Sequence, residues 1–299
     1  MNYSEIIVLI LRIMNFSDLQ VFHCVAQVGG ITRAAERLHR VPSSVTTRVQ
    51  QLEEDLGVEL FLRDGRRIAI TPAGQVLLGY AERILALAEE AREALQDAAP
   101  RGRLRLGTME STAATRLPRP LAEYHLRYPQ VMLELSTGPT RQLLAQVLGG
   151  DLDAALVADP TQDKRLESAS AFTEELVLVA EAGHRRIRSA KDLSRPTALA
   201  FGSGCTYRHR LEEWFAAGGV DPDRIVELTS YHAILSCAVA GMGIALLPRV
   251  LLEIFPERDR LSVHAMPASL RKTKTLLVWR KGTRSAKVVA LADLLVAGK

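Results

Sequence analysis

The feature that most constrains the fold of this chain is a pair of helical patterns joined by a tight turn in residues 31–57. The second helix is marked by apolar residues that recur at steps of four, three and four, namely Val45, Val49, Leu52 and Leu56. This spacing is typical of one apolar face of a helix. Pro42 fits the first turn, where its missing N–H costs nothing, and Gly57 fits the C-terminal cap. The pattern predicts a short helix over 31–38 and a second helix that begins at Pro42 and ends before Gly57.

Two short β-prone runs follow, at residues 59–63 and 67–71, and Asp64-Gly65 between them is a typical hairpin turn. Two helices followed by a hairpin form the plan of a winged helix-turn-helix, a fold that inserts its second helix into the major groove of DNA. The helical spacing alone also fits an ordinary helical pair with a solvated polar face. The hairpin favours DNA binding, because its tip carries arginines beside the second helix.

Candidate DNA-contacting residues lie on two surfaces of this region. The side chains opposite the apolar face of the second helix are short, neutral hydrogen-bonding groups, which suit contact with base edges and phosphates. Arginines at the hairpin can reach phosphates or the minor groove, although arginines at an exposed turn are usually only solvated. The candidates are Thr32, Arg33, Pro42, Ser43, Ser44, Thr46, Thr47, Arg48, Gln51, Arg63, Arg66 and Arg67.

Residues 16–74 resemble the DNA-binding domain of the LysR-type transcriptional regulators. The matching residues are Phe16, Leu19, Phe22, Thr32, Ala34, Ala35, Leu38, Val45, Thr46, Val49, Leu52, Glu53, Leu56, Gly57, Leu60, Phe61, Arg63 and Thr71-Pro72-Ala73-Gly74. Val41-Pro42 stands where the family usually has Ser-Gln, and Gly29-Gly30 where it often has Gly-Ser. The resemblance implies a transcriptional regulator that binds double-stranded DNA, with base contacts that do not transfer cleanly to this chain.

Size and composition agree with this class of protein. The 299 residues are enough for about two domains with buried cores. The net charge of +4 is compatible with a nucleic-acid partner, although arginines and acidic residues nearly balance between positions 31 and 72. The cysteines at positions 24, 205 and 237 have no CxxC spacing, so we expect neither a zinc site nor a disulfide framework, and no cofactor.

Residues 1–13 are apolar but too short to span a membrane, and they lack the features of a signal peptide. We interpret them as an N-terminal extension ahead of a winged helix-turn-helix domain over 14–74. The free cysteines and the missing targeting segment predict a cytoplasmic protein without a membrane partner.

A long helix is predicted over 75–100, where it would link the DNA-binding domain to the rest of the chain. Its apolar stripe consists of Leu77, Tyr80, Ile84, Leu87, Ala88, Ala91 and Leu95. Because an exposed apolar stripe is costly, we expect this linker helix to pair with a second copy, as linker helices do in the resembling family. The prediction is a homodimer or homotetramer that binds a DNA site with two-fold symmetry.

Residues 101–299 alternate short apolar runs with helical segments, which favours parallel α/β units. Helices are predicted over 112–127, 140–149 and 206–217. The fold class is therefore α/β, with an N-terminal winged helix-turn-helix and linker helix, then a two-lobed effector-binding domain like a periplasmic binding protein. The lobes are expected at 101–174 with 262–299, and at 175–261. The LysR resemblance extends over this domain more loosely.

Ligands of such folds bind at the carboxyl ends of strands, where helix N-termini present free N–H groups. The candidate effector-binding residues at these positions are Met109, Ser111, Thr112, Thr140, Ser203, Cys205, Thr206, Ser230 and Tyr231. Each hydroxyl taken alone also fits an ordinary helix cap. In the resembling family such hydroxyls hold a small molecule, which is often an anion. Glu110 could instead pair with a cationic effector, or simply favour a helix dipole.

These patterns predict a ligand-responsive transcriptional regulator rather than an enzyme. The sequence has no P-loop, no G-x-S-x-G and no cluster of metal ligands, so we assign no catalytic and no metal-binding residues. The alternatives are an α/β enzyme or a redox sensor that carries a DNA-binding domain. A thiol at a helix N-terminus can be reactive, which would suit Cys205 with Cys237 as its partner.

Overall fold

The computed structural model of the protein describes residues 15–64, 67–94, 99–159, 163–194, 196–283 and 285–297. The chain folds into two compact units, unit 1 over residues 1–96 and unit 2 over residues 97–299. The predicted N-terminal extension, residues 1–13, lies outside the described residues. No helix in these described ranges is long and apolar enough to cross a membrane.

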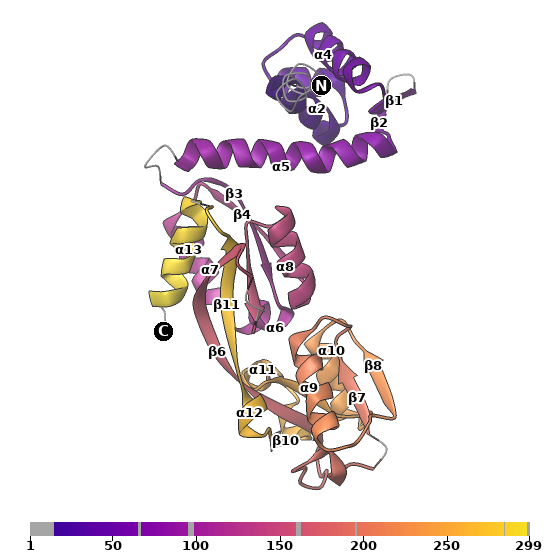
Figure 1. Ribbon diagram of the computed structural model, residues 1–299, viewed down its shortest axis with the longest axis vertical. Helices are drawn as coiled ribbons and strands as arrows, with labels where there is room; N and C mark the ends of the chain where they lie inside the picture. Colours follow the sequence, from indigo (N-terminus) through magenta and orange to yellow (C-terminus); the bar gives the residue numbers. More distant parts are fainter. Residues whose placement is uncertain are drawn as a thin grey trace. The chain divides into compact units, whose positions relative to one another are not determined.

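Unit 1 has a helix-turn-helix followed by a hairpin and a long helix (Figure 1). Its elements are α2 (Phe16–Val28), α3 (Ile31–Arg37), α4 (Pro42–Leu56), β1 (Phe61–Asp64), β2 (Arg67–Ile70) and α5 (Pro72–Ala94). An apolar core joins them, in which the rings of Phe22 and Phe61 lie with their centroids 5.3 Å apart. Ala34 and Ala35 are buried, because their small side chains let α3 approach its neighbours closely.

Helix α4 has the ends and the apolar face that the sequence predicts. Val45, Val49 and Leu52 are buried in the unit 1 core. Pro42 occupies the first turn, and Gly57 ends the helix in the left-handed conformation with a φ of 69°, where a residue with a Cβ is strained. The helix therefore starts and stops for local reasons that the sequence contains.

The hairpin is fixed to the helices around it by hydrogen bonds and close packing. Phe61 of β1 lies opposite Ile70 of β2 in an antiparallel pair. Glu53 of α4 accepts hydrogen bonds from the backbone N–H groups of Leu60 and Phe61, at 2.8 and 3.1 Å. In the first turn of α5, a Cβ on Gly74 would lie 2.2 Å from the backbone oxygen of Leu60, so only glycine fits there.

Helix α5 corresponds to the predicted linker helix but begins earlier, at Pro72. Leu77 packs against the unit 1 core, whereas the side chains of Tyr80 and Leu87 are 57 % and 60 % exposed. Leu95, the last residue of the predicted stripe, lies outside the described residues. The helix thus uses one face within unit 1 and leaves a second apolar face open.

The first lobe of unit 2 is a mixed sheet with helices on both faces (Figure 1). Its elements are β3 (Gly102–Thr108), α6 (Glu110–Thr115), α7 (Pro118–Arg127), β4 (Val131–Thr137), α8 (Thr140–Gly149), β5 (Ala154–Ala158), β11 (Lys272–Arg280) and α13 (Ala286–Ala297). Alternate residues of β5 face opposite sides: Leu156 packs with α7 and α13, and Val157 packs with α8. β3 pairs in parallel with β4 and β5, and β11 returns antiparallel to β5.

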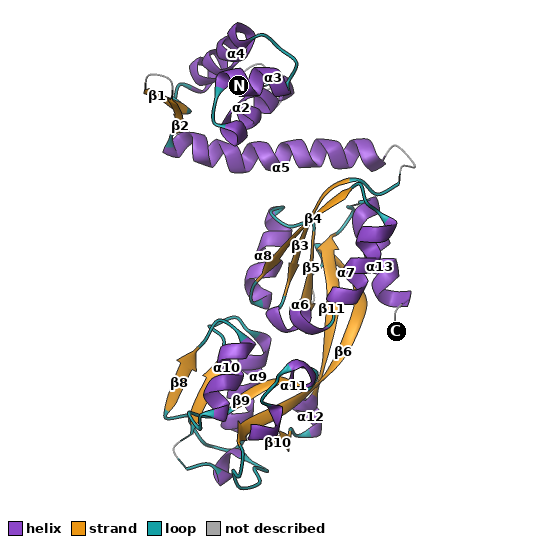
Figure 2. Ribbon diagram, turned by 180° about the vertical axis from the view of Figure 1, so that it is seen from behind, coloured by secondary structure: helices purple, strands orange, loops and turns teal. Residues whose placement is uncertain are grey.

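Strand β6 (Leu166–Glu181) belongs to both lobes and runs from one into the other (Figure 2). It pairs with β11 as far as Glu175 and then with β9 (Ala245–Pro248) and β10 (Leu261–Ala265) over 176–181. β6 thus changes its partner strands after Glu175, close to the residue at which the second lobe was expected to begin. β10, in contrast, falls largely in the segment expected in the first lobe, but its pairing places it in the second.

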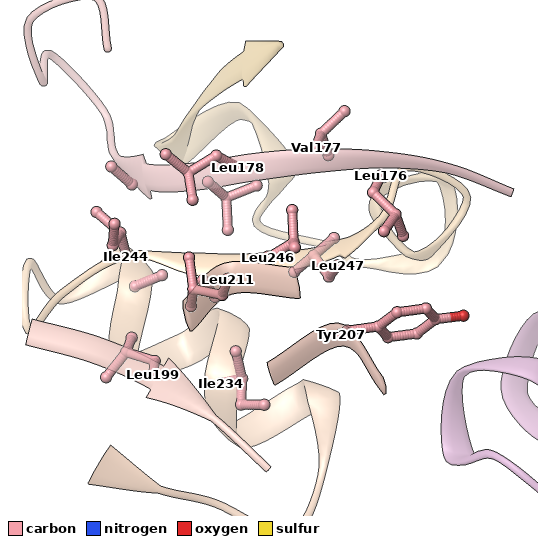
Figure 3. Packing of buried hydrophobic residues seen from close by; sticks show 14 of the residues in the cluster. Leu176, Val177, Leu178, Leu199, Tyr207, Leu211, Ile234, Ile244, Leu246 and Leu247 are labelled. Carbon is pink, nitrogen blue, oxygen red and sulfur yellow. The ribbon is translucent and has the colours of Figure 1, made fainter. Parts of the chain in front are cut away.

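The remaining elements of the second lobe surround its part of β6. They are η1 (Ala190–Asp192), β7 (Thr197–Ala200), α9 (Thr206–Ala217), β8 (Arg224–Glu227), α10 (Tyr231–Val239), α11 (Leu251–Ile254), η2 (Arg258–Arg260) and α12 (Ala268–Arg271). Leu178 of β6, Leu211 of α9 and Ile234 of α10 are buried together in its core (Figure 3). Tyr207 lies at the edge of this cluster, with its hydroxyl turned away from the other labelled side chains (Figure 3).

The helix predicted over 112–127 is wrong as a single element, because the structure divides it into α6 and α7. Pro118 has no N–H to continue the hydrogen-bond ladder of α6, and its ring would clash with the preceding turn. It instead occupies the first turn of α7, where proline is tolerated. The helices predicted over 140–149 and 206–217 are confirmed as α8 and α9.

Candidate functional site

A cavity of about 400 Å³ lies between the two lobes of unit 2. Its walls are four segments that each follow the carboxyl end of a strand, before α6, α8, α9 and α10. The first lobe contributes Met109, Glu110, Thr137, Gly138, Pro139, Thr140 and Gln142. The second lobe contributes Phe201, Gly202, Ser203, Cys205, Thr206, Tyr207, Leu228, Thr229 and Tyr231.

Hydrogen bonds cross between the lobes at this cavity. The Thr206 hydroxyl, at the start of α9, lies 3.1 Å from Oγ1 of Thr140 and 3.2 Å from the backbone oxygen of Ala158. The backbone N–H of Tyr231, at the start of α10, donates to Oε1 of Glu110 over 3.4 Å. The same residues that line the cavity therefore hold the lobes together.

Glu110 dominates the electrostatics of the cavity. It is the first residue of α6, it is partly buried, and burial raises the pKa of its carboxyl group while the N–H of Tyr231 opposes that shift. Its Oε2 atom is buried and makes no hydrogen bond to any described group. Among the described residues that line the cavity, no other side chain carries a charge.

Two buried tyrosines also line this cavity. Burial raises the pKa of both Tyr207 and Tyr231. The hydroxyls of Ser111 and Tyr207 are buried and have no hydrogen-bond partner in the described part of the chain. The site thus combines a carboxylate with unused hydroxyl groups.

The structure places most of the predicted effector-site residues around one cavity. Met109, Thr140, Ser203, Cys205, Thr206 and Tyr231 line it. Ser111 and Thr112 are buried but do not line the cavity, and the Ser230 hydroxyl caps α10 by accepting from the N–H of Ala233. Their role in effector binding stays a prediction.

The sequence patterns did not identify the apolar residues that line the cavity. Phe201 and Leu228 each directly follow a strand, and the ring of Phe201 lies 4.8 Å from that of Tyr231 between centroids. An aromatic or aliphatic residue at such a strand end is also common in an ordinary core. Only their place in the lining of the cavity distinguishes them.

The geometry disfavours the redox alternative. Cys205 precedes α9, but burial raises the pKa of its thiol, with the N–H groups of Tyr207 and Arg208 opposing the shift. A raised pKa reduces the reactive thiolate fraction. Cys205 and Cys237 are free thiols that pack against the second-lobe core.

The face of α4 opposite its buried stripe is exposed and neutral. Ser43, Thr47 and Gln51 are exposed, and Ser44 and Thr46 are partly exposed. The hydroxyls of Thr46 and Thr47 donate to backbone oxygens one turn earlier, at 3.0 Å each. Pro42 and Thr32 are exposed at the N-terminal ends of α4 and α3. This face can therefore contact DNA without rearrangement of the helix.

The candidate arginines of unit 1 differ in their partners. Arg48 forms an ion pair with the buried carboxylate of Asp18, at 2.6 Å, which fixes its side chain against α2. Arg33 donates to the backbone oxygen of Gly29 at 3.0 Å. At the hairpin, Arg66 lies outside the described residues, and for Arg63 and Arg67 only the strand backbone is described.

Both units match known protein families. Residues 16–75 match the family described as "Bacterial regulatory helix-turn-helix protein, lysR family". Residues 97–298 match the family described as "LysR substrate binding domain". The two matches together account for the winged helix-turn-helix and for the two-lobed unit.

Curated relatives cover most of the chain. The HTH-type transcriptional regulator GltR of Bacillus subtilis is 41 % identical over 271 residues, which is 90 % of this chain and 92 % of that protein. The HTH-type transcriptional regulator YofA of Bacillus velezensis is 40 % identical over 268 residues, 89 % of this chain and 92 % of that protein.

Solved structures share the fold at lower identity. Full-length OxyR from Pseudomonas aeruginosa has a TM-score of 0.67 at 24 % identity, covering 94 % of each chain. CbnR in complex with its target DNA has a TM-score of 0.64 at 23 % identity, covering 96 % of this chain and 100 % of that one. Together with the family matches and the relatives, this shows that the chain belongs to the LysR family of transcriptional regulators, with a DNA-binding and an effector-binding domain.

Proposed function

We propose that this LysR-family protein is a ligand-responsive regulator, without turnover of its ligand, that binds a two-fold symmetric DNA site as a homo-oligomer. A small molecule in the inter-lobe cavity controls it. The observation that carries the proposal is the cavity, where helix N-termini from both lobes meet. A ligand there contacts both lobes at once, so it can shift the equilibrium between lobe arrangements.

The contacts across the cavity support a switch of this kind. Thr206 bonds to the other lobe through Thr140 and Ala158, and Tyr231 does so through Glu110. Single hydrogen bonds of this type contribute about 0.5–1.5 kcal/mol each. A ligand that replaces or adds a few such bonds is therefore enough to change the balance between lobe arrangements.

The open apolar face of α5 supports pairing with a second copy of the chain. Tyr80, Ile84 and Leu87 recur at helical spacing and are exposed. Exposed apolar side chains gathered on one face of a helix are typical of an interaction site. Pairing through a linker helix would bring two copies of α4 to one DNA site, which accounts for the expected symmetry.

The test begins with the full chain and a pool of random duplexes, from which bound sequences are selected and read. We expect an inverted repeat, with affinity that falls steeply as salt rises because phosphates are contacted. Compounds that stabilise the full chain in a thermal-shift screen are then added to the selected duplex. A stabilising compound that leaves DNA affinity unchanged, or that the protein converts to a product, contradicts the proposal.

A further inference from the structure

We propose that the effector of this regulator carries a protonated amine or another cationic hydrogen-bond donor, which Glu110 holds in the inter-lobe cavity. This inference rests on the proposed function and deepens it, because it names the charge class of the ligand in the same cavity. It replaces the anionic effector that the family resemblance implies.

The charges around the cavity are the first argument. Glu110 is the one charged side chain among the described residues of the lining, and lysine, arginine and histidine are absent from that described lining. Arginines of the adjoining helix α9 are engaged with other groups: Arg208 pairs with Glu212, and Arg210 pairs with Asp159. A carboxylate or phosphate ligand would therefore lie beside a carboxylate with no lining cation to offset the repulsion.

The hydrogen-bond partners of Glu110 are the second argument. Oε1 accepts from the N–H of Tyr231, whereas Oε2 is buried and has no donor within the described part of the chain. A buried acceptor without a donor is unfavourable, the more so when it carries charge. Oε2 exposes almost no surface in this arrangement of the lobes, so an N⁺–H group of a ligand reaches it only as the lobes shift, and it then stabilises the ionised carboxylate.

The walls of the cavity suit the rest of such a ligand. Met109, Phe201 and Leu228 are apolar, and the paired rings of Phe201 and Tyr231 add aromatic faces that attract cations. The hydroxyl groups of Thr140 and Thr206, which also line the cavity, offer further polar contacts. The volume of about 400 Å³ is typical of small-molecule sites.

Glu110 also has a structural interpretation that a test must separate from ligand binding. As the first residue of α6 it favours the helix dipole, and through Oε1 it caps α10 at Tyr231. The cap requires only an oxygen acceptor, which glutamine also supplies. Glu110→Gln therefore keeps the hydrogen bond to Tyr231 and removes the charge that a cationic ligand needs.

Calorimetric titration of the full chain with charge-matched probes tests the inference. Phenethylamine and putrescine are the cations, 3-phenylpropionate is the anion, and N-acetylphenethylamine is the neutral analogue. We expect an amine to bind about tenfold or more tightly than the anion and the neutral analogue, as a charge-assisted hydrogen bond implies. Glu110→Gln should remove that preference. Glu123→Gln is the matched control, because Glu123 is exposed on α7, pairs with Arg127 and lies outside the lining.

The comparison of probes on the wild-type chain holds even if a variant fails to fold. Binding of 3-phenylpropionate or N-acetylphenethylamine as tightly as the amines overturns the inference and leaves ligand-responsive regulation intact. Amine binding that Glu110→Gln leaves unchanged also overturns it. If no amine binds at millimolar concentration, the inference is overturned, whereas the proposed function is tested separately by the thermal-shift screen and the selected duplex.

Discussion

The two recognition surfaces of this regulator, the outer face of α4 and the inter-lobe cavity, differ in exposure and in charge. On α4, Ser43, Thr47 and Gln51 are exposed and neutral. The cavity lies between the lobes, has a largely apolar surface, and holds Glu110 as the one charge in its described lining. A neutral polar face can approach polyanionic DNA, whereas an acidic cavity repels anions. The proposals thus assign ligands of opposite charge to the two surfaces.

Because of this difference, substitutions on α4 and substitutions in the cavity should affect different properties of the protein. Exposed positions of α4 contribute little to packing, so changes there should alter DNA affinity without loss of stability. In the cavity, Thr140 is buried and bonds across the lobes, so changes there should alter the response to effector. The two surfaces can therefore be disabled one at a time.

Leu87→Asp should have the largest effect, because it places a charge in the open apolar face of α5. We expect the oligomer to dissociate and affinity for the selected duplex to fall about 100-fold or more, since two linked half-site contacts become independent. Light scattering during gel filtration and fluorescence anisotropy measure the two effects. Ala86→Asp, at an exposed position off this stripe, is the control. An oligomer that persists in Leu87→Asp contradicts the role of α5.

Thr47→Glu should break DNA binding while leaving the cavity intact. The added carboxylate on the exposed face of α4 would repel phosphates, and we expect affinity for DNA to fall by about 30- to 100-fold at low salt. Gln130→Glu adds the same charge at an exposed position of unit 2 and should leave affinity unchanged. Equal losses in both variants would show a general charge effect instead of contact through α4.

Thr140→Val should weaken the response to effector without weakening basal DNA binding. It removes one hydroxyl from the cavity, and we expect the effector concentration needed for half-maximal response to rise about fivefold, the equivalent of one hydrogen bond. Thr173→Val, which removes an exposed hydroxyl from β6, is the control. Loss of basal DNA binding in Thr140→Val would instead mark the residue as structural.

The smallest expected effect concerns the pH dependence of stability. Burial raises the pKa of Glu110, so the folded state favours its protonated form. The stability that this form contributes is present at acidic pH and is lost as pH rises through the raised pKa. Wild type should therefore lose a little stability relative to Glu110→Gln between acidic and neutral pH, and the partial exposure of Glu110 limits the size of this loss. The melting temperature of each protein is measured over this pH range. If the two melting temperatures change in parallel with pH, the burial of the charge is contradicted.

Local signals in the sequence located much of this fold. The bounds of α4, α8 and α9 follow from periodicity and from residues such as Pro42 and Gly57. The pattern of a strand followed by a helix also selected Thr140 and Thr206, and both residues line the cavity. Other features needed contacts from distant segments. Arg48 is held by Asp18 of another helix, and β6 continues through both lobes because it finds different partners in each.

The sequence by itself determined the family, through its motifs. It also determined the bounds of the main helices and the strand-to-helix connections that line the cavity, because caps, turns and periodicity act over a few residues. Only the tertiary structure decided that Glu110 is an isolated charge. Its backbone partner Tyr231 lies 121 positions away, and its Oε2 finds no donor among the described residues only because of how four separate segments pack. The energy of a charge depends on everything near it in space, which no local pattern of residues encodes.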